Sequence, residues 1–172
     1  MEIENRLASD LKMLNEVVYK RCGFDFFNFN ENYESKEYGA CTFLLNTKKI
    51  HYRFSKITPT KIGQFVTIWK RNIDGITEPY NVLDDFDLII ISSRSKEHFG
   101  QFIFPKSVLL ENGILSTEAK SGKRGIRVYP PWEKPSNKQA IKTQQWQLNY
   151  FLTVNDKASV DLELALKLLN KI

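Results

Sequence analysis

The stretch FDLIIIS at 86–92, followed by GQFIFP at 100–105, decides the fold that the sequence predicts. Apolar residues fill the first stretch with almost no alternation, which is typical of a strand buried on both faces of a sheet. The second stretch is rich in aromatic and β-branched residues, so we expect it to pair beside the first. A sheet covered on both faces therefore organises the predicted fold.

Further strands are predicted at 40–46, 49–57, 62–71 and 125–130. The first two, ACTFLLN and KIHYRFSKI, flank a short turn and predict a hairpin. In GQFVTIWKR at 63–71, strand alternation puts Gln64 and Lys70 on one side and Phe65 and Arg71 on the other. The aromatic stretch 24–39 is expected to be a loop.

Four helices are predicted around these strands. Apolar residues spaced three or four apart predict an amphipathic helix over 3–22, ended by Gly23. A short helix follows at 106–113, and two more are expected at 137–152 and 159–172, the last capped by Ser159. No linker divides the 172 residues. We therefore predict one α+β domain over 1–172, with a mixed central sheet bracketed by helices.

Composition argues against several classes of protein. No tract is long and apolar enough to cross a membrane, and the charged start is unlike a secretion signal, so we expect a cytoplasmic protein without membrane insertion. Cys22 and Cys41 are too few for a disulfide framework, and with only His51 and His98 they predict no zinc site. We expect reduced, packed thiols and no resident metal or cofactor. The oligomeric state stays open.

Charge is strongly segregated along the chain, although the net charge is only +5. Residues 38–73 contain no Asp or Glu, and residues 119–155 contain Glu133 alone, while Lys and Arg recur in both segments. This distribution predicts one basic face, which would attract nucleic-acid phosphates or another polyanion. A solvated lysine surface is the alternative.

The segment KSGKRGIRVYPPW at 120–132 gives the strongest local signal for nucleic acid. Lys123 and Arg124 lie between two glycines, where an open backbone would expose its N–H groups to a phosphate. Arg127 and Tyr129 share a strand face, and Trp132 follows a rigid Pro-Pro, so cations and stacking rings alternate. Alternatively, Gly-Lys-Arg-Gly is an ordinary turn and Trp132 fastens the loop to the core.

The two Gly-Gln-Phe strands add polar candidates. Gln64 and Gln101 are suited to base edges or phosphates, or else they satisfy backbone groups at strand margins. In the helix 137–152, either Ile141 and Leu148 face the core or Trp146 and Tyr150 do, and the second arrangement would expose Gln144. The residues predicted to bind nucleic acid are Arg53, Lys56, Lys61, Gln64, Lys70, Arg71, Gln101, Lys106, Lys123, Arg124, Arg127, Tyr129, Trp132 and Gln144.

Four stretches carry a family resemblance: ITPTKIGQFVTIWKR at 57–71, GQFIFPKSVLLENGI at 100–114, GKRGIRVYPPW at 122–132 and KQAIKTQQWQLNYF at 138–151. They resemble the MepB family, and the match runs from about Gly23 to Phe151. The resemblance implies a compact cytosolic protein that binds nucleic acid and has a core like that of restriction endonucleases.

Such nucleases place an Asp on one strand and Glu-x-Lys on the next, to hold a divalent cation near the scissile phosphate. Here Asp85 and Asp87 precede the buried strand, but Gln101-Phe102-Ile103 stands where Glu-x-Lys is needed. We therefore expect a nucleic-acid-binding protein with a degenerate nuclease-like core. The alternatives are a magnesium- or manganese-dependent nuclease or phosphodiesterase that uses Glu37 or Asp87, and a protein-interaction module with a basic face. The sequence leaves enzymatic activity undecided.

Overall fold

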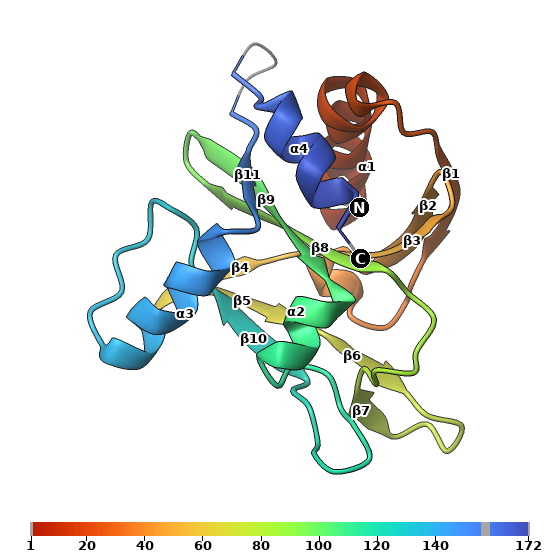
Figure 1. The fold of residues 1–172 in the computed structure, drawn as a ribbon, viewed down its shortest axis with the longest axis vertical. Helices are drawn as coiled ribbons and strands as arrows, with labels where there is room; N and C mark the ends of the chain where they lie inside the picture. Colours follow the sequence, from red (N-terminus) through yellow and green to blue (C-terminus); the bar gives the residue numbers. More distant parts are fainter. Residues whose placement is uncertain (1, 156–158, 172) are drawn as a thin grey trace.

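The fold is built on one mixed, six-stranded sheet, seen in a computed structural model that describes residues 2–155 and 159–171 (Figure 1). Its strands are β1 (Phe26–Glu31), β2 (Cys41–Leu45), β3 (Lys48–Phe54), β8 (Leu88–Ser95), β9 (His98–Pro105) and β11 (Phe151–Thr153). They lie in the order β1-β2-β3-β8-β9-β11, and β3 and β8 are parallel whereas the other neighbours are antiparallel. The α+β prediction with a mixed sheet is confirmed.

Strand β8 lies inside this sheet, as its lack of alternation predicts. Leu88 and Ile90 belong to the apolar core on one face, while Ile89 and Ile91 belong to the core on the other. The predicted pairing with GQFIFP is also confirmed, because β9 runs antiparallel to β8 from Leu88↔Pro105 to Ser95↔His98. Burial on both faces explains why β8 needs apolar residues at successive positions.

Helices cover the first face of the sheet (Figure 1). Helix α1 (Glu2–Leu14) continues through a wider π turn, Asn15–Tyr19, and a tighter 3-10 turn, Lys20–Cys22. It ends at Gly23, whose φ of +77° suits glycine. Helix α4 (Leu162–Leu169) packs beside it, and its cap is Asp161, whose side chain accepts a hydrogen bond from Leu164 N. The prediction of Ser159 as the cap is therefore wrong, since the helix starts later.

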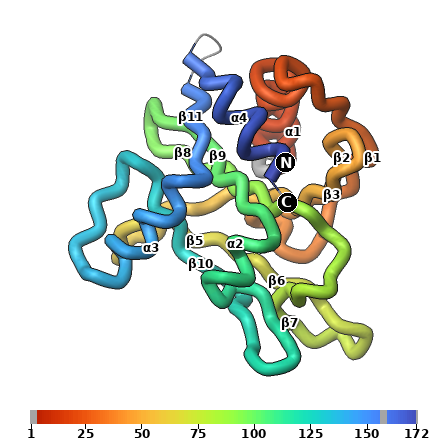
Figure 2. The backbone as a smooth tube through the Cα atoms, in the orientation of Figure 1, coloured from red at the N-terminus to blue at the C-terminus, as the bar shows by residue number. Residues whose placement is uncertain are grey.

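The second face carries a smaller sheet and two helices (Figure 1). The small sheet has the order β10-β5-β4, formed by β4 (Lys56–Thr58), β5 (Lys61–Thr67) and β10 (Gly125–Val128). Helices α2 (Lys106–Glu111) and α3 (Lys138–Leu148) flank it. A hairpin of β6 (Trp69–Arg71) and β7 (Thr77–Pro79) extends away from the main body, as the tube in Figure 2 shows.

Several segments differ from the predicted elements, and the strand expected at 49–57 is divided at Ser55 into β3 and β4. The strand expected at 62–71 breaks between β5 and β6 at Ile68, whose N–H donates to Arg124 O. The helix expected to reach residue 152 ends at Leu148, because Phe151 packs edge-on against Phe102 and pairs with β9 as part of β11. The expected loop 24–39 contains the edge strand β1.

Both cysteines are unbonded thiols, as predicted. Burial raises the pKa of the Cys41 thiol to about 12, and burial also raises the pKa of Cys22. Among the helices in the described part of the chain, none is long and apolar enough to span a membrane.

Candidate nucleic-acid interface

The two glutamines are buried, so the prediction that they face a ligand is wrong. Gln64 is 0 % exposed, accepts a hydrogen bond from the Ser55 hydroxyl at 2.7 Å and donates to Arg94 O. Gln101 is also 0 % exposed and bonds with the hydroxyls of Tyr19 and Ser92. Hydroxyls buried in the sheet need partners, and the two amides supply them.

The cations that end the two Gly-Gln-Phe strands meet at one aspartate rather than at a ligand site. Lys70 Nζ lies 2.5 Å from Asp84 Oδ1, and Lys106 Nζ donates to the Asp84 backbone oxygen. Arg53 is 1 % exposed and donates to Tyr52 O and Tyr80 Oη. These three cations are engaged inside or at the margin of the fold, whereas the sequence predicted them to face nucleic acid.

Acids from neighbouring segments neutralise much of the cationic segment 38–73. Arg71 forms an ion pair with Glu34 at 2.6 Å, Lys56 pairs with Glu37 at 3.4 Å, and Lys49 pairs with Asp85. These ion pairs reduce the positive charge that Arg71, Lys56 and Lys49 offer to a ligand. Lys61 is exposed and takes part in no ion pair among the described residues.

Two further candidates fasten a loop to the core. The Trp132 ring is stacked on His98, with centroids 5.2 Å apart, and meets Phe151 edge-on. Gln144 Nε2 donates to the Pro130 and Glu133 carbonyls. The alternative in which Trp132 fastens the loop is the one observed, because His98 already occupies a face of the indole. Gln144 likewise serves the loop and is not an exposed reader.

The Gly-Lys-Arg-Gly segment presents side chains and not N–H groups. Gly122 N donates to Ser116 Oγ and Lys123 N to Ile114 O, so the prediction of an open backbone for phosphate is wrong at both positions. A Cβ at Gly122 would lie 2.3 Å from Ile114 O, so this approach requires glycine. The Lys123 and Arg124 side chains are exposed, and no ion pair within the described residues involves them.

A cleft of about 410 Å³ lies between α3, β10 and the end of α2. Its lining includes Lys123, Arg127, Lys142, Gln139, Thr143 and Trp146, and within 2–155 and 159–171 no Asp or Glu belongs to it. Arg127 is also fixed across the small sheet, because its guanidinium donates to Gly63 O and Thr58 Oγ1. Tyr129 is 8 % exposed and lines the same cleft. This cleft brings together Lys123, Arg127 and Tyr129 of the predicted residues.

Gln147 sets the position of α3 along the cleft. It is buried, its Oε1 accepts from Tyr129 N at 2.8 Å, and its Nε2 donates to Arg127 O at 2.9 Å. Trp146 packs against Phe104, with ring centroids 5.3 Å apart, whereas Ile141 and Leu148 are 38 % and 37 % exposed. Of the two helix orientations considered, the one with Trp146 facing the protein is therefore observed.

The sequence prediction omitted Lys142 and Gln139, which the cleft adds from α3. Gln139, Thr143 and Trp146 form a polar and aromatic stripe at helical spacing, and Lys142 borders it. This stripe was the available signal. The stripe indicates a cleft only once the fold places β10 opposite α3.

The candidate carboxylates are engaged in separate contacts. Asp87 Oδ2 accepts a hydrogen bond from Lys49 N at 2.8 Å, while Asp85 and Glu37 form the ion pairs already described. Within residues 2–155 and 159–171, no three His, Cys, Asp or Glu side chains are grouped so as to hold a metal ion.

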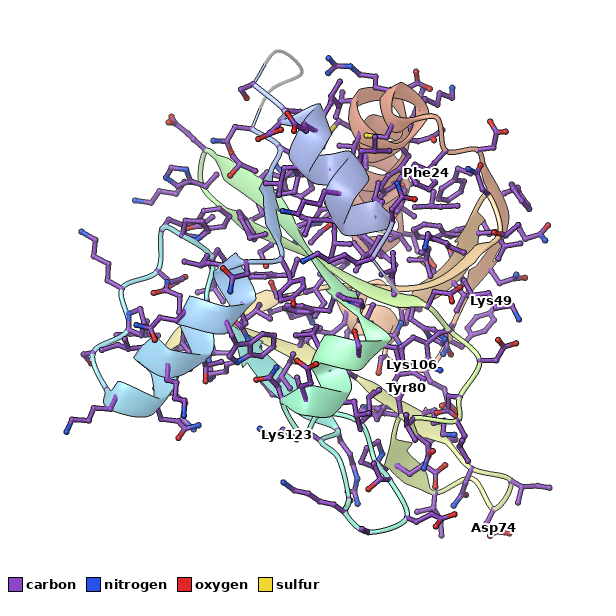
Figure 3. All side chains as sticks on the ribbon, viewed as in Figure 1. Phe24, Lys49, Asp74, Tyr80, Lys106 and Lys123 are labelled. Carbon is purple, nitrogen blue, oxygen red and sulfur yellow. The ribbon has the colours of Figure 1, made fainter. Side chains whose placement is uncertain are left out.

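A second polar cluster, which the sequence did not predict, lies on the opposite side of α2 from Lys123 in the view of Figure 3. Arg53 donates to Tyr80 Oη, and Tyr80 Oη lies 3.1 Å from His51 Nδ1. Because a guanidinium only donates, the Tyr80 hydroxyl is left to give its own proton to His51. Burial, with the nearby Arg53 charge, lowers the pKa of His51 to about 4, so His51 is neutral at pH 7.

Comparison with known proteins yields two matches. A family model described as MepB-like matches residues 32–153. A solved structure described as "Crystal Structure of MepB" is similar with a TM-score of 0.74 and 37 % identity, covering 76 % of this chain and 88 % of that chain. No curated protein is similar enough to count as a match.

Proposed function

For this chain, which belongs to the MepB-like family, we propose that it binds nucleic acid through the phosphate backbone, with the cleft between α3 and β10 at the centre of the interface. The proposal includes a cytoplasmic location, where such ligands are found. Binding of this kind depends on lysine and arginine side chains that replace counterions along the phosphates.

One observation carries the proposal: the described residues that line the cleft include three cations and no acid. Arg124 and Lys138, which adjoin the lining residues Lys123 and Gln139 in the chain, are exposed and take part in no ion pair among the described residues. The cationic segment 38–73 differs, because Glu34, Glu37, Asp84 and Asp85 pair with four of its cations, Arg71, Lys56, Lys70 and Lys49. Phosphates would supply the missing counter-charge at the cleft.

The test is binding of fluorescent oligonucleotides to the purified protein over a salt series, with magnesium present and the products run on a gel. We expect affinity to fall steeply with salt. The double variant Lys123→Ala/Lys142→Ala should bind at least about tenfold more weakly, and its log–log salt slope should fall by roughly 1.4–1.8 for two lost phosphate contacts.

Lys49→Ala/Arg71→Ala is the matched control, because it removes the same charge from positions that are already paired with acids. Its affinity should change much less. Absence of binding at low salt would overturn the proposal. Magnesium-dependent cleavage that is lost in Asp87→Asn or Glu37→Gln would instead support the nuclease or phosphodiesterase alternative.

A further inference from the structure

Resting on this proposed function, we infer that the cleft takes one unpaired nucleotide of a single-stranded nucleic acid, with the base against Trp146 and the phosphates between Lys123 and Lys142.

The size of the cleft favours a single nucleotide. Its volume of about 410 Å³ falls within the roughly 300–1,000 Å³ of sites that enclose small ligands. In a duplex, each base is paired and stacked, so it can enter such a cleft only after leaving the helix. An unpaired base has an open face and open edges from the start.

Trp146 provides a surface for stacking. One side of the indole is packed against Phe104 and the side chain is half-buried, yet the indole also lines the cleft. Packing of this kind holds the ring in place before a ligand arrives, which lowers the entropic cost of stacking a base on it. Gln139 and Thr143 lie on the same stripe of α3, at the distance of one helical turn.

The outer edge of β10 provides hydrogen-bonding groups opposite the indole. Ile68 N donates to Arg124 O, and Gly125 pairs with Thr67, so the antiparallel alternation turns the backbone groups of Gly125 and Arg127 away from β5 and toward the cleft. Gln147 already occupies Arg127 O. No hydrogen bond among the described residues uses the Gly125 carbonyl and N–H or the Arg127 N–H, so an acceptor flanked by donors is available for a base edge.

These groups fit a strand with little sequence preference. A stacking ring accepts any base, and one acceptor beside one donor matches the edges of several bases. The cations on the rim lie on different elements, Lys123 before β10 and Lys142 on α3, so phosphates on both sides of the bound nucleotide have a partner.

The experiment compares a single-stranded oligonucleotide, a duplex of equal length, the same strand with one abasic site per binding register, and a mononucleotide. Trp146→Leu retains apolar packing on Phe104 and removes the stacking surface, while Trp146→Phe retains a ring. We expect Trp146→Leu to weaken single-strand binding at least about fivefold and to leave duplex binding unchanged, with Trp146→Phe in between.

A fluorescence measurement gives a readout that does not depend on affinity. In a Trp69→Phe/Trp132→Phe variant, Trp146 is the remaining tryptophan. A strand with bases should quench its emission and the abasic strand should not. Circular dichroism and the melting temperature of each variant confirm that it is folded.

The two proposals fail in different ways. If no nucleic acid binds, the proposed function fails and the inference fails with it. If strand and duplex bind equally and Trp146→Leu changes neither, the interface binds phosphates but the cleft holds no base, so only the inference is overturned. If a mononucleotide binds as tightly as the strand, the cleft is a site for free nucleotides, and the inference that it binds single-stranded nucleic acid is overturned.

Discussion

Lys70 and Asp84 form a 2.5 Å ion pair that ties the end of one Gly-Gln-Phe strand to the loop before β8. The same aspartate accepts a hydrogen bond from Lys106, which follows the second Gly-Gln-Phe strand, and its Oδ2 accepts from Asn81 N at 2.7 Å. Asp84 therefore joins its own loop to β6 and to the start of α2. In both Gly-Gln-Phe strands, the lysine that follows the strand residues binds Asp84.

Replacing Asp84 with alanine should lower the free energy of unfolding by about 1–3 kcal/mol, because the half-buried Lys70 loses the nearer of its two carboxylates and the Asn81 N–H loses its acceptor. Urea unfolding followed by circular dichroism measures the change. Asp74→Ala is the control, since Asp74 lies on the exposed turn of the β6–β7 hairpin. Equal stability of the two variants would show that the junction contributes nothing.

Gln147→Ala should destabilise the fold by about 2 kcal/mol or more, because it leaves the buried Tyr129 N–H and Arg127 carbonyl without partners. Gln145→Ala, on the exposed side of the same helix, should change stability by less than about 0.5 kcal/mol. Melting temperatures of the Gln147→Ala and Gln145→Ala variants measure this difference in stability. Because Gln147 also positions α3, its variant should weaken nucleic-acid binding as well, and unchanged binding would contradict this role.

His51 should make the protein sensitive to mild acid. Burial and the Arg53 and Lys106 charges lower its pKa in the folded state from 6.5 to about 4, against an opposing effect of Asp84. Below pH 6.5 the unfolded chain binds a proton that the folded chain does not, so stability is complete above pH 6.5 and falls as the pH drops toward 4. With an allowance for the partial exposure of His51, the free energy of unfolding should fall by about 2 kcal/mol over this pH range.

The check is urea unfolding of wild type and His51→Gln between pH 7.5 and 4. Gln can still accept the Tyr80 hydroxyl proton but does not titrate. The variant should lose less stability over this interval. Parallel pH profiles for the two proteins would assign the acid sensitivity to other groups.

Gly122→Ala should cost about 1–3 kcal/mol, because its Cβ would lie 2.3 Å from Ile114 O and 2.7 Å from Leu115 C, and neither backbone atom can move alone. The shift would also displace Lys123 from the cleft. Ser121→Ala, at the exposed neighbouring position, is the control. Thermal unfolding and oligonucleotide binding should both respond to Gly122→Ala and hardly to Ser121→Ala.

The sequence by itself determined the elements whose signal is local. The unbroken apolar run of β8 reports burial on both faces of a sheet, because neighbouring residues in one strand face opposite sides of it. The short turn between two apolar runs likewise indicates the hairpin of β2 and β3. The family resemblance came from the same local stretches, and residues 32–153 confirm it.

Only the tertiary structure decided which polar residues remain available for a ligand. Glu34, Glu37 and Asp84 pair with Arg71, Lys56 and Lys70, and Gln101 finds Tyr19 from a distant helix. Lys142 joins Lys123 because α3 packs against β10 through Gln147. A charge is neutralised, and an amide is hydrogen-bonded, by groups that the fold brings within a few ångströms of it. Those groups come from distant parts of the chain, so the local sequence does not reveal them.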